Sequence, residues 1–168
     1  MISEIHLNIG SNSGDSRAFI ARAVAALRSA FGGTLSVSSK VESEPWGFVS
    51  ANRFVNVGVL IALEISQPWT PLLLDTLLAK IKAIEKSISP MPHRKPDGSY
   101  ADREIDIDII AVDSLEYSST ALTLPHPHMS ERCFVLEPLA ELASGWKHPA
   151  SGLTAAEMLA RLKPCENI

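Results

Sequence analysis

Apolar and polar residues alternate in three stretches of the chain, a period of two that is typical of β-strands, and a fourth stretch is an almost continuous apolar run. The four stretches lie at residues 5–9, 35–41, 54–63 and 105–110. In the last of them isoleucines alternate with acidic residues, which indicates a strand with one buried, apolar face. We therefore predict four strands, each directing an apolar face at a common core.

Two long segments between these strands have the three- and four-residue spacing of an amphipathic helix. The first is expected to be capped at residues 15–16 and to end before Gly32. The second begins at Thr70 and Pro71 and places its apolar residues inward, with Glu85 among the polar residues of its outer side. Both helices are expected to cover the sheet.

The C-terminal part of the chain adds a short hairpin after Asp113 and two further helices, capped at Ser130 and Thr154. The order strand, helix, strand, strand, helix, strand is that of a ferredoxin-like α+β sandwich. We predict this βαββαβ fold, with a C-terminal hairpin and helical additions, as a single domain over residues 1–168.

The composition is that of an ordinary globular protein, with 46% hydrophobic and 20% charged residues. A net charge of −4 argues against a duplex-binding surface, and no apolar run suits a membrane span or a secretory signal. Cys133 and Cys165 form neither a disulfide framework nor a metal-ligand spacing and are expected to be buried or idle thiols. These features predict a cytoplasmic protein that binds neither nucleic acid nor membrane.

Asp106 and Asp108 lie on the same face of the last strand, roughly 7 Å apart at their backbones. Two carboxylates this close repel one another unless a cation lies between them. Magnesium suits hard oxygen ligands and takes one or two protein carboxylates, with its other ligands from water and phosphates. The pair therefore predicts a magnesium–nucleotide site, and the alternative is a strand whose outer face is simply solvated.

Several other residues could surround a small ligand. Trp46 lies in a loop with a second aromatic residue and either caps the core or walls a flat heterocycle. Asn56 interrupts an apolar run and needs hydrogen-bond partners, which a neighbouring strand or a planar ligand could supply. Arg132 falls in the first turn of a predicted helix, where the helix dipole disfavours a cation, so it is expected to serve an anion. The triplet His93-Arg94-Lys95 lies in a loop expected to be a lid or a disordered segment.

Five motifs follow one another along the chain over about residues 5–145. They are Ile9-Gly10-Ser11-Asn12, Ser43-Glu44-Pro45-Trp46-Gly47, Phe54-Val55-Asn56, Arg103-Glu104-Ile105-Asp106-Ile107-Asp108, and Pro125-His126-Pro127-His128-Met129 with Arg132 and Phe134-Val135-Leu136. The ordered set resembles the 6-hydroxymethyl-7,8-dihydropterin pyrophosphokinase family. The resemblance implies a ferredoxin-like enzyme of folate biosynthesis that transfers pyrophosphate from ATP to the hydroxymethyl group of a reduced pterin and releases AMP.

The same resemblance implies roles for individual residues. The expected catalytic residues are Arg103, which would contact the transferred group, and Asp106 and Asp108, which would hold two magnesium ions. The residues expected to bind ATP are Glu85, His126, Arg132, Arg94 and Lys95. The residues expected to bind the pterin are Ser43, Trp46, Phe54, Asn56 and Phe134.

The chain departs from the family pattern at three places. Residues 90–102 lack the tryptophan that many members carry, Ala121 replaces an often basic residue, and Lys82 stands where a nucleotide-contacting glutamine is common. These changes concern ATP binding and leave the metal and pterin positions intact. One alternative is therefore a non-catalytic ferredoxin-like module that binds a pterin or nucleotide without turnover. Another is a regulatory domain that dimerises through a free sheet edge.

Overall fold

The computed structural model describes residues 1–44, 52–89, 95–97, 102 and 104–162. Within these residues an antiparallel sheet has the strand order β2-β4-β1-β5, and β3 also pairs with β4. The strands of this sheet are β1 (Ile2–Ser11), β2 (Thr34–Val37), β3 (Val41–Ser43), β4 (Phe54–Glu64) and β5 (Asp106–Val112). The fold is therefore a mixed α/β arrangement in which β1 lies between β4 and β5.

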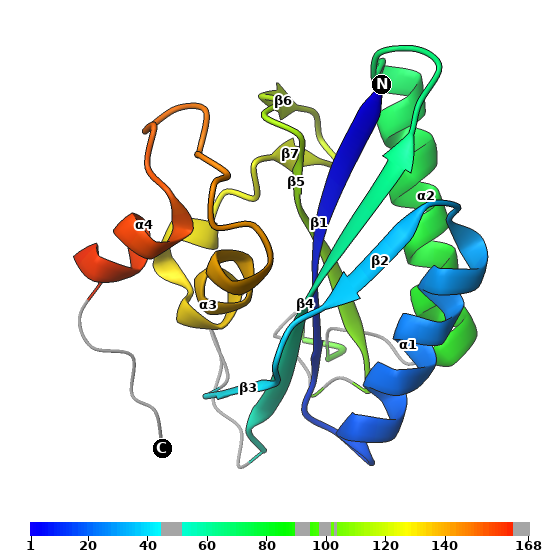
Figure 1. Ribbon diagram of the computed structural model, residues 1–168. Coiled ribbons are helices and arrows are strands. Elements are labelled where there is room, and N and C mark those ends of the chain that lie inside the picture. Colours follow the sequence, from blue (N-terminus) through cyan, green and yellow to red (C-terminus); the bar gives the residue numbers. More distant parts are fainter. Residues whose placement is uncertain (45–51, 90–94, 98–101, 103, 163–168) are drawn as a thin grey trace.

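Helices cover both faces of this sheet (Figure 1). The helices α1 (Ser16–Ala30) and α2 (Pro71–Ile88) lie on one face, and α3 (Cys133–Leu142) and α4 (Ala155–Arg161) lie on the other. Three of the four expected caps are confirmed, because Asp15 accepts from Ala18 N, Thr70 from Leu73 N, and Thr154 forms a capping box with Glu157.

Each face of the sheet has its own hydrophobic core. The odd-numbered residues of β1, such as Ile5 and Ile9, pack with α1 and α2. Residues of α3, such as Val135 and Leu136, pack with Ile110 and α4 on the opposite face. The even-numbered residues of β1 face α3, so polar side chains at these positions are buried between a sheet and a helix.

A glycine of β4 brings α3 close to the sheet. A Cβ atom added at Gly58 would lie 2.6 Å from Cβ of Pro138, which is too near for two carbon atoms. The absence of a side chain therefore lets α3 pack directly on β4. This contact fixes where the N-terminus of α3 lies over the sheet.

The single strand expected at residues 35–41 is two strands in the structure. Ser38 interrupts it, because its hydroxyl accepts from Gly58 N at 2.8 Å while its own N–H donates to Gly58 O at 3.0 Å. Glu141 of α3 then accepts from the backbone N–H of Ser39. The polarity of these serines, rather than the apolar alternation, decides where pairing with β4 breaks.

The hairpin expected after β5 is present as β6 (Tyr117–Ser118) and β7 (Thr123–Leu124). The helix expected to be capped by Ser130 begins later, because a 3-10 turn at Met129–Glu131 precedes it. Its N-cap residue is Arg132.

Cys133 is disulfide-bonded, so the expectation of an idle thiol there is wrong. Sequence spacing alone does not reveal whether sulfur atoms meet in space. Cys165 lies outside the described residues.

None of the helices in the described part of the chain combines the length and hydropathy needed to span a bilayer.

Candidate functional site

Two rows of residues cross the sheet on the face that carries α3. Strand register places Asn56 of β4, Gly10 of β1 and Asp106 of β5 side by side in one row. In the next row Asn8 of β1 is the partner of Asp108. Cross-strand partners point to the same face, so residues from three strands are directed at one region.

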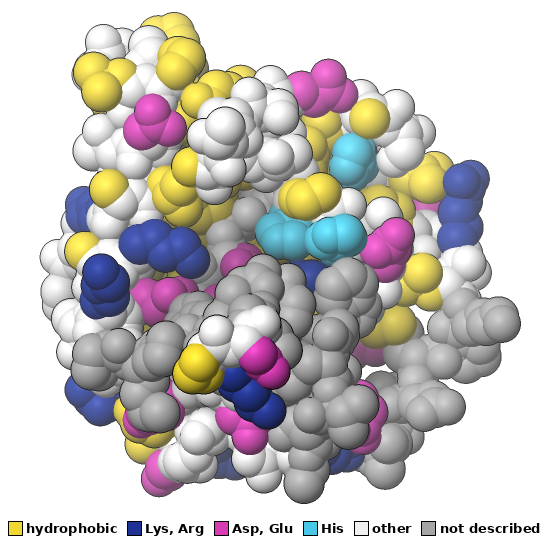
Figure 2. Space-filling model, turned by 180° about the vertical axis from the view of Figure 1, so that it is seen from behind, with side chains coloured by type: hydrophobic (Ala, Val, Ile, Leu, Met, Phe, Trp, Pro, Cys, Tyr) yellow, Lys and Arg dark blue, Asp and Glu magenta, His cyan; other side chains and the backbone are white. Residues whose placement is uncertain are grey.

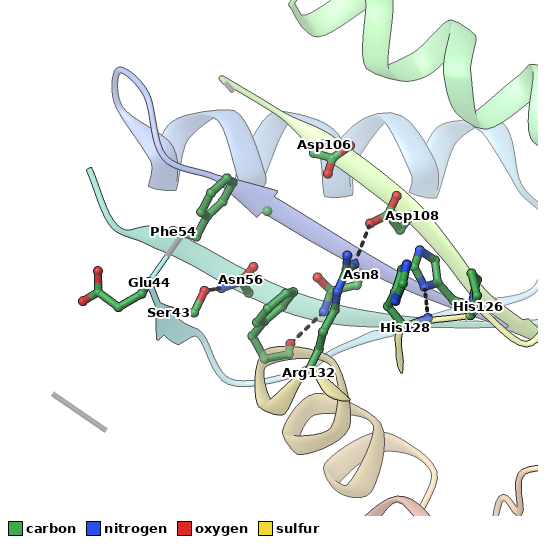
Figure 3. A pocket seen from close by; sticks show the side chains of 13 residues that line it. Asn8, Ser43, Glu44, Phe54, Asn56, Asp106, Asp108, His126, His128 and Arg132 are labelled. Atoms are coloured by element: carbon green, nitrogen blue, oxygen red, sulfur yellow. Dashed lines mark hydrogen bonds and ion pairs between the residues drawn. The ribbon is translucent and has the colours of Figure 1, made fainter. Parts of the chain in front are cut away.

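A cavity of about 250 Å³ opens over these rows (Figure 3). On the surface view, histidine, basic and acidic side chains gather around a hollow on the corresponding face (Figure 2). The residues that line the cavity are Asn8, Gly10, Ser43, Glu44, Phe54, Asn56, Asp106, Asp108, His126, Pro127, His128, Arg132 and Phe134.

A second cavity of about 260 Å³ shares Asp108, His126 and Pro127 with the first. It extends between α2, which contributes Lys82, and the β6–β7 hairpin, which contributes residues 119–123. A ligand with two parts could therefore occupy both cavities and place the junction of its parts at Asp108 and His126.

The two aspartates share one face of β5, as their spacing predicts, and both line the first cavity. Both are half-buried, and the side chain of Asp108 remains 32% exposed. Their oxygens are hard ligands that are accessible from the cavity and surrounded by other polar groups, which suits a hydrated magnesium ion. Among the described residues no third carboxylate, histidine or cysteine joins them in a metal-ligand cluster. The remaining ligands would therefore have to come from water and a bound phosphate.

Arg132 lies at the N-cap of α3. Its Nη1 atom is 3.9 Å from Oδ2 of Asp108, and its guanidinium carbon is 5.6 Å from the ring centroid of Phe134. The cation thus connects the carboxylates of β5 with an aromatic wall of the cavity (Figure 3).

His126 is held as a neutral imidazole. Burial, together with the nearby Arg132 and His128, lowers its pKa to about 4 against the opposing charge of Asp106. The Nδ1 atom accepts a hydrogen bond from His128 N at 3.2 Å, so the neutral ring carries its proton on Nε2. His126 can therefore donate a hydrogen bond to a phosphate oxygen without adding a charge.

Asn56 is buried, and its amide nitrogen is fully occupied. Its Nδ2 donates to the backbone oxygen of Val41 at 3.1 Å and to Oγ of Ser43 at 2.8 Å. The neighbouring strand thus satisfies the donors, and the amide oxygen is left for a ligand. A Cβ atom at Gly10 would lie 3.1 Å from this oxygen, so the glycine keeps the space beside it open.

Glu85 does not lie on the outer side of α2, as the sequence interpretation had it. It is only 6% exposed, and its Oε2 accepts from Ile107 N at 2.8 Å. It belongs to the buried stripe of Leu74, Leu77, Ile81 and Ile88, whose spacing it continues. Glu85 lines neither cavity, so it supports the strand between the two aspartates from behind.

The other expected residues divide into three groups. Ser43, Phe54 and Phe134 line the first cavity. Lys95 is exposed and lines neither cavity. Trp46, Arg94 and Arg103 lie outside the described residues.

Sequence reasoning missed Asn8 and Glu44 as cavity residues. Glu44 is exposed and its Oε1 lies 3.1 Å from Nε of Arg53. Asn8 carried one signal, because it is a polar residue on the face of a central strand. Only the register with Asp108 places it beside the two aspartates.

We expect the free energy of unfolding to fall as pH is lowered from about 6.5 to about 4. The pKa of His126 is about 4 in the folded protein, and burial lowers the pKa of His6 to about 4 against the opposing charge of Asp113. Between the two pH values the unfolded chain binds more protons than the folded chain, so acid favours unfolding. Urea unfolding at several pH values measures this slope. His126→Gln should make it shallower, and an unchanged slope would contradict the neutral state; His148→Gln is the control histidine outside the cavity.

Comparison with known proteins gives one family. The family model described as 7,8-dihydro-6-hydroxymethylpterin-pyrophosphokinase (HPPK) matches residues 6–144. A Porphyromonas gingivalis protein is 35% identical over 146 residues, which cover 86% of this chain and 93% of that protein. A Methylorubrum extorquens protein is 34% identical over 164 residues, which cover 97% of this chain and 96% of that protein. Both carry the name 2-amino-4-hydroxy-6-hydroxymethyldihydropteridine pyrophosphokinase.

Solved structures share the fold at lower identity. One, described as HPPK-DHPS in complex with substrates, has a TM-score of 0.66 and 13% identity, covering 94% of this chain. A Plasmodium falciparum HPPK-DHPS with pterin and p-hydroxybenzoate has a TM-score of 0.65 and 14% identity. The present chain spans 43% and 44% of these two solved chains, so the likeness concerns one part of each.

Proposed function

The chain belongs to the 7,8-dihydro-6-hydroxymethylpterin pyrophosphokinase family, and on this premise we propose that it transfers pyrophosphate from ATP to 6-hydroxymethyl-7,8-dihydropterin. AMP and the pterin diphosphate are the products, and the reaction belongs to folate biosynthesis in the cytoplasm. The observation that carries the proposal is that Asp106 and Asp108 line one cavity and that Asp108 also lines the adjoining one.

Asp106 and Asp108 would hold magnesium, and we propose two ions, as the resemblance implies. Bound there with ATP, magnesium would neutralise the phosphate charge and fix the triphosphate in line with its acceptor. The role of the chain is then to present both carboxylates from one rigid strand. Arg132 adds a positive charge 3.9 Å from Asp108, and His126 adds a neutral donor, both suited to phosphate oxygens.

The pterin would lie in the first cavity between the aromatic rings of Phe54 and Phe134. Asn56 offers its amide oxygen because its nitrogen is already bonded to Val41 and Ser43. Such an acceptor suits the N–H edge of a pterin ring. Ser43 contributes indirectly by holding the Asn56 amide in this orientation.

The nucleotide would extend from the aspartates into the second cavity. Lys82 lines this second cavity with a positive charge, at the position where the family often carries a glutamine. Its Nζ lies 3.7 Å from Oε2 of Glu85, so it is held near the cavity wall. Oε2 of Glu85 accepts from the backbone N–H of Ile107, so we propose that Glu85 positions β5 instead of binding ATP directly.

We also propose that the fold is of the ferredoxin-like class. Leaving aside the short β3, the remaining strands of the sheet are β1, β2, β4 and β5 in chain order, and their spatial order β2-β4-β1-β5 supports this assignment. The placement of α1 and α2 on one face supports it as well (Figure 1). The hairpin and the two C-terminal helices are the additions.

Incubation with ATP, magnesium and 6-hydroxymethyl-7,8-dihydropterin tests the proposed activity. We expect AMP to appear in equal amount with the pterin diphosphate. Thermal stabilisation by the pterin without AMP would favour the non-catalytic binding module instead. No response to either ligand would exclude both functions.

Asn56→Ala is expected to weaken pterin binding by about 1 to 3 kcal/mol, because a buried hydrogen bond to the ring is lost. Isothermal titration with the pterin, in the presence of magnesium and a non-hydrolysable ATP analogue, measures the loss. Ser38→Ala is a suitable control, because it also removes a buried hydrogen bond to β4, at Gly58. If the pterin affinity of Asn56→Ala is unchanged, Asn56 has only a structural role.

A further inference from the structure

Asn8 is a second buried asparagine, and it lies beside the aspartate pair. It is only 5% exposed and lies on β1 between Gly58 of β4 and Asp108 of β5. It lines the first cavity next to Asp108 and Arg132 (Figure 3). An amide buried this deeply in a sheet requires hydrogen-bond partners.

The orientation of the Asn8 amide is fixed by α3. Its Nδ2 donates to the backbone oxygen of Phe134 at 2.9 Å. A carbonyl oxygen can only accept, so the nitrogen of the amide must face α3 and the oxygen must face away from it. Asn8 thereby ties β1 to the first turn of the helix that carries the aromatic wall.

The amide oxygen of Asn8 has no donor among the residues that the structure describes, since the bond to Phe134 is the side-chain hydrogen bond of Asn8. Asn56 shows the same arrangement, with its nitrogen bonded to the protein and its oxygen left over. Two buried asparagines therefore present acceptors to one cavity. Neither oxygen is among the buried side-chain atoms that lack a partner, so both are accessible from the cavity, where a ligand's donor can replace water.

The strand order indicates which part of the ligand this is. A pterin held at Asn56 on β4 must reach Asp106 and Asp108 on β5, and β1 lies between these two strands. The part of the substrate that crosses β1 is the hydroxymethyl group, because it is the group that must meet the phosphate. The residues of β1 that line the cavity are Gly10 and Asn8, and of these two only Asn8 has a polar side chain.

We propose that Oδ1 of Asn8 accepts the hydrogen bond of the substrate's hydroxymethyl O–H and orients this oxygen beside the aspartate pair. Asn8 is a residue that positions the acceptor alcohol, and it takes no proton from it. The inference rests on the proposed function, since it assumes that the cavity binds this pterin.

The test compares two ligands, 6-hydroxymethyl-7,8-dihydropterin and its 6-methyl analogue, which lacks the hydroxyl. Dissociation constants are measured for the intact protein with magnesium and a non-hydrolysable ATP analogue. The wild type should prefer the hydroxymethyl compound, and Asn8→Ala should reduce this preference by roughly three- to tenfold, the value of one hydrogen bond. In Asn8→Ser the serine side chain is too short to reach Phe134, so this variant should reduce the preference by a similar factor. It replaces Asn8→Ala in the test if the alanine variant does not fold.

Ser3→Ala is the matched control. Ser3 is an equally buried polar residue of β1, bonded to Asp113 and Trp69 outside the cavity. Its loss should lower stability and leave the preference between the two pterins unchanged.

Three results would contradict either the role of Asn8 or the proposed function. If Asn8→Ala weakens both pterins by the same factor, Asn8 acts only through Phe134 and contacts no hydroxyl. If Asn8→Ala changes neither dissociation constant, the inference fails while the proposed function stands. If the wild type binds neither pterin, the proposed function itself fails.

Discussion

Asp106→Asn or Asp108→Asn is expected to lower kcat by on the order of a thousandfold and to leave the fold intact. Metal-assisted stabilisation of a transferring phosphoryl group contributes several kcal/mol, and each 1.4 kcal/mol changes a rate tenfold. Asparagine keeps the shape of the side chain and removes the negative charge that holds the cation. The rate of AMP formation at saturating ATP and magnesium measures the effect.

The stability of these variants separates a functional role from a structural one. Neither aspartate is fully buried, and the ion pair between Asp108 and Arg132 spans 3.9 Å, so its loss costs at most about 1 kcal/mol. Without magnesium we therefore expect the free energy of unfolding to change by no more than about 1 kcal/mol. Asp75→Asn, an exposed change on α2, is the control for both measurements. Near-normal AMP formation in either variant would show that the metal assignment is wrong.

Glu85→Ala is expected to lower the free energy of unfolding by about 2 kcal/mol and to reduce turnover together with it. The loss removes a charged acceptor and leaves the buried N–H of Ile107 without its side-chain partner. Ile107 lies between the two aspartates, so a shift of its backbone moves both carboxylates. Urea unfolding and AMP formation should therefore respond to this one substitution together.

Glu85→Gln provides the comparison, because its amide oxygen can still accept from Ile107 N. We expect it to recover most of the stability and most of the turnover. A glutamate that binds ATP from the protein surface would behave differently. If Glu85→Ala keeps the stability of the wild type and loses only ATP affinity, then Glu85 does not support β5. It would instead bind ATP directly.

The comparison of Glu85 with Asp106 and Asp108 shows where sequence reasoning succeeds and fails. The aspartates alternate with isoleucines, and alternation on a strand assigns faces without further information. Glu85 is charged, and its charge suggested an exposed position. Its spacing from Ile81 and Ile88 indicated the buried stripe, and the structure follows the spacing because a backbone N–H is there to receive the carboxylate.

The asparagines show a second limit of sequence reasoning. Asn56 could be recognised as a polar residue in an apolar strand, but the sequence left open whether a strand or a ligand satisfies it. In the structure the amide nitrogen of Asn56 donates hydrogen bonds to Val41 and Ser43, and its amide oxygen faces the cavity. Asn8 was overlooked, because its importance depends on Asp108 of β5 and Phe134 of α3, both about a hundred or more residues away in the chain.

The sequence alone determined the helices and three of their caps, the faces of the strands, the placement of the two aspartates and the resemblance to the pterin pyrophosphokinases. These are local properties, because helical and strand periods and short motifs depend on neighbouring residues. The tertiary structure decided the neutral state of His126, the inward position of Glu85, the break between β2 and β3, and the meeting of Asn8 with the aspartate pair. Those features depend on burial, on strand register and on hydrogen bonds between distant segments, which exist only once the sheet and α3 have packed together.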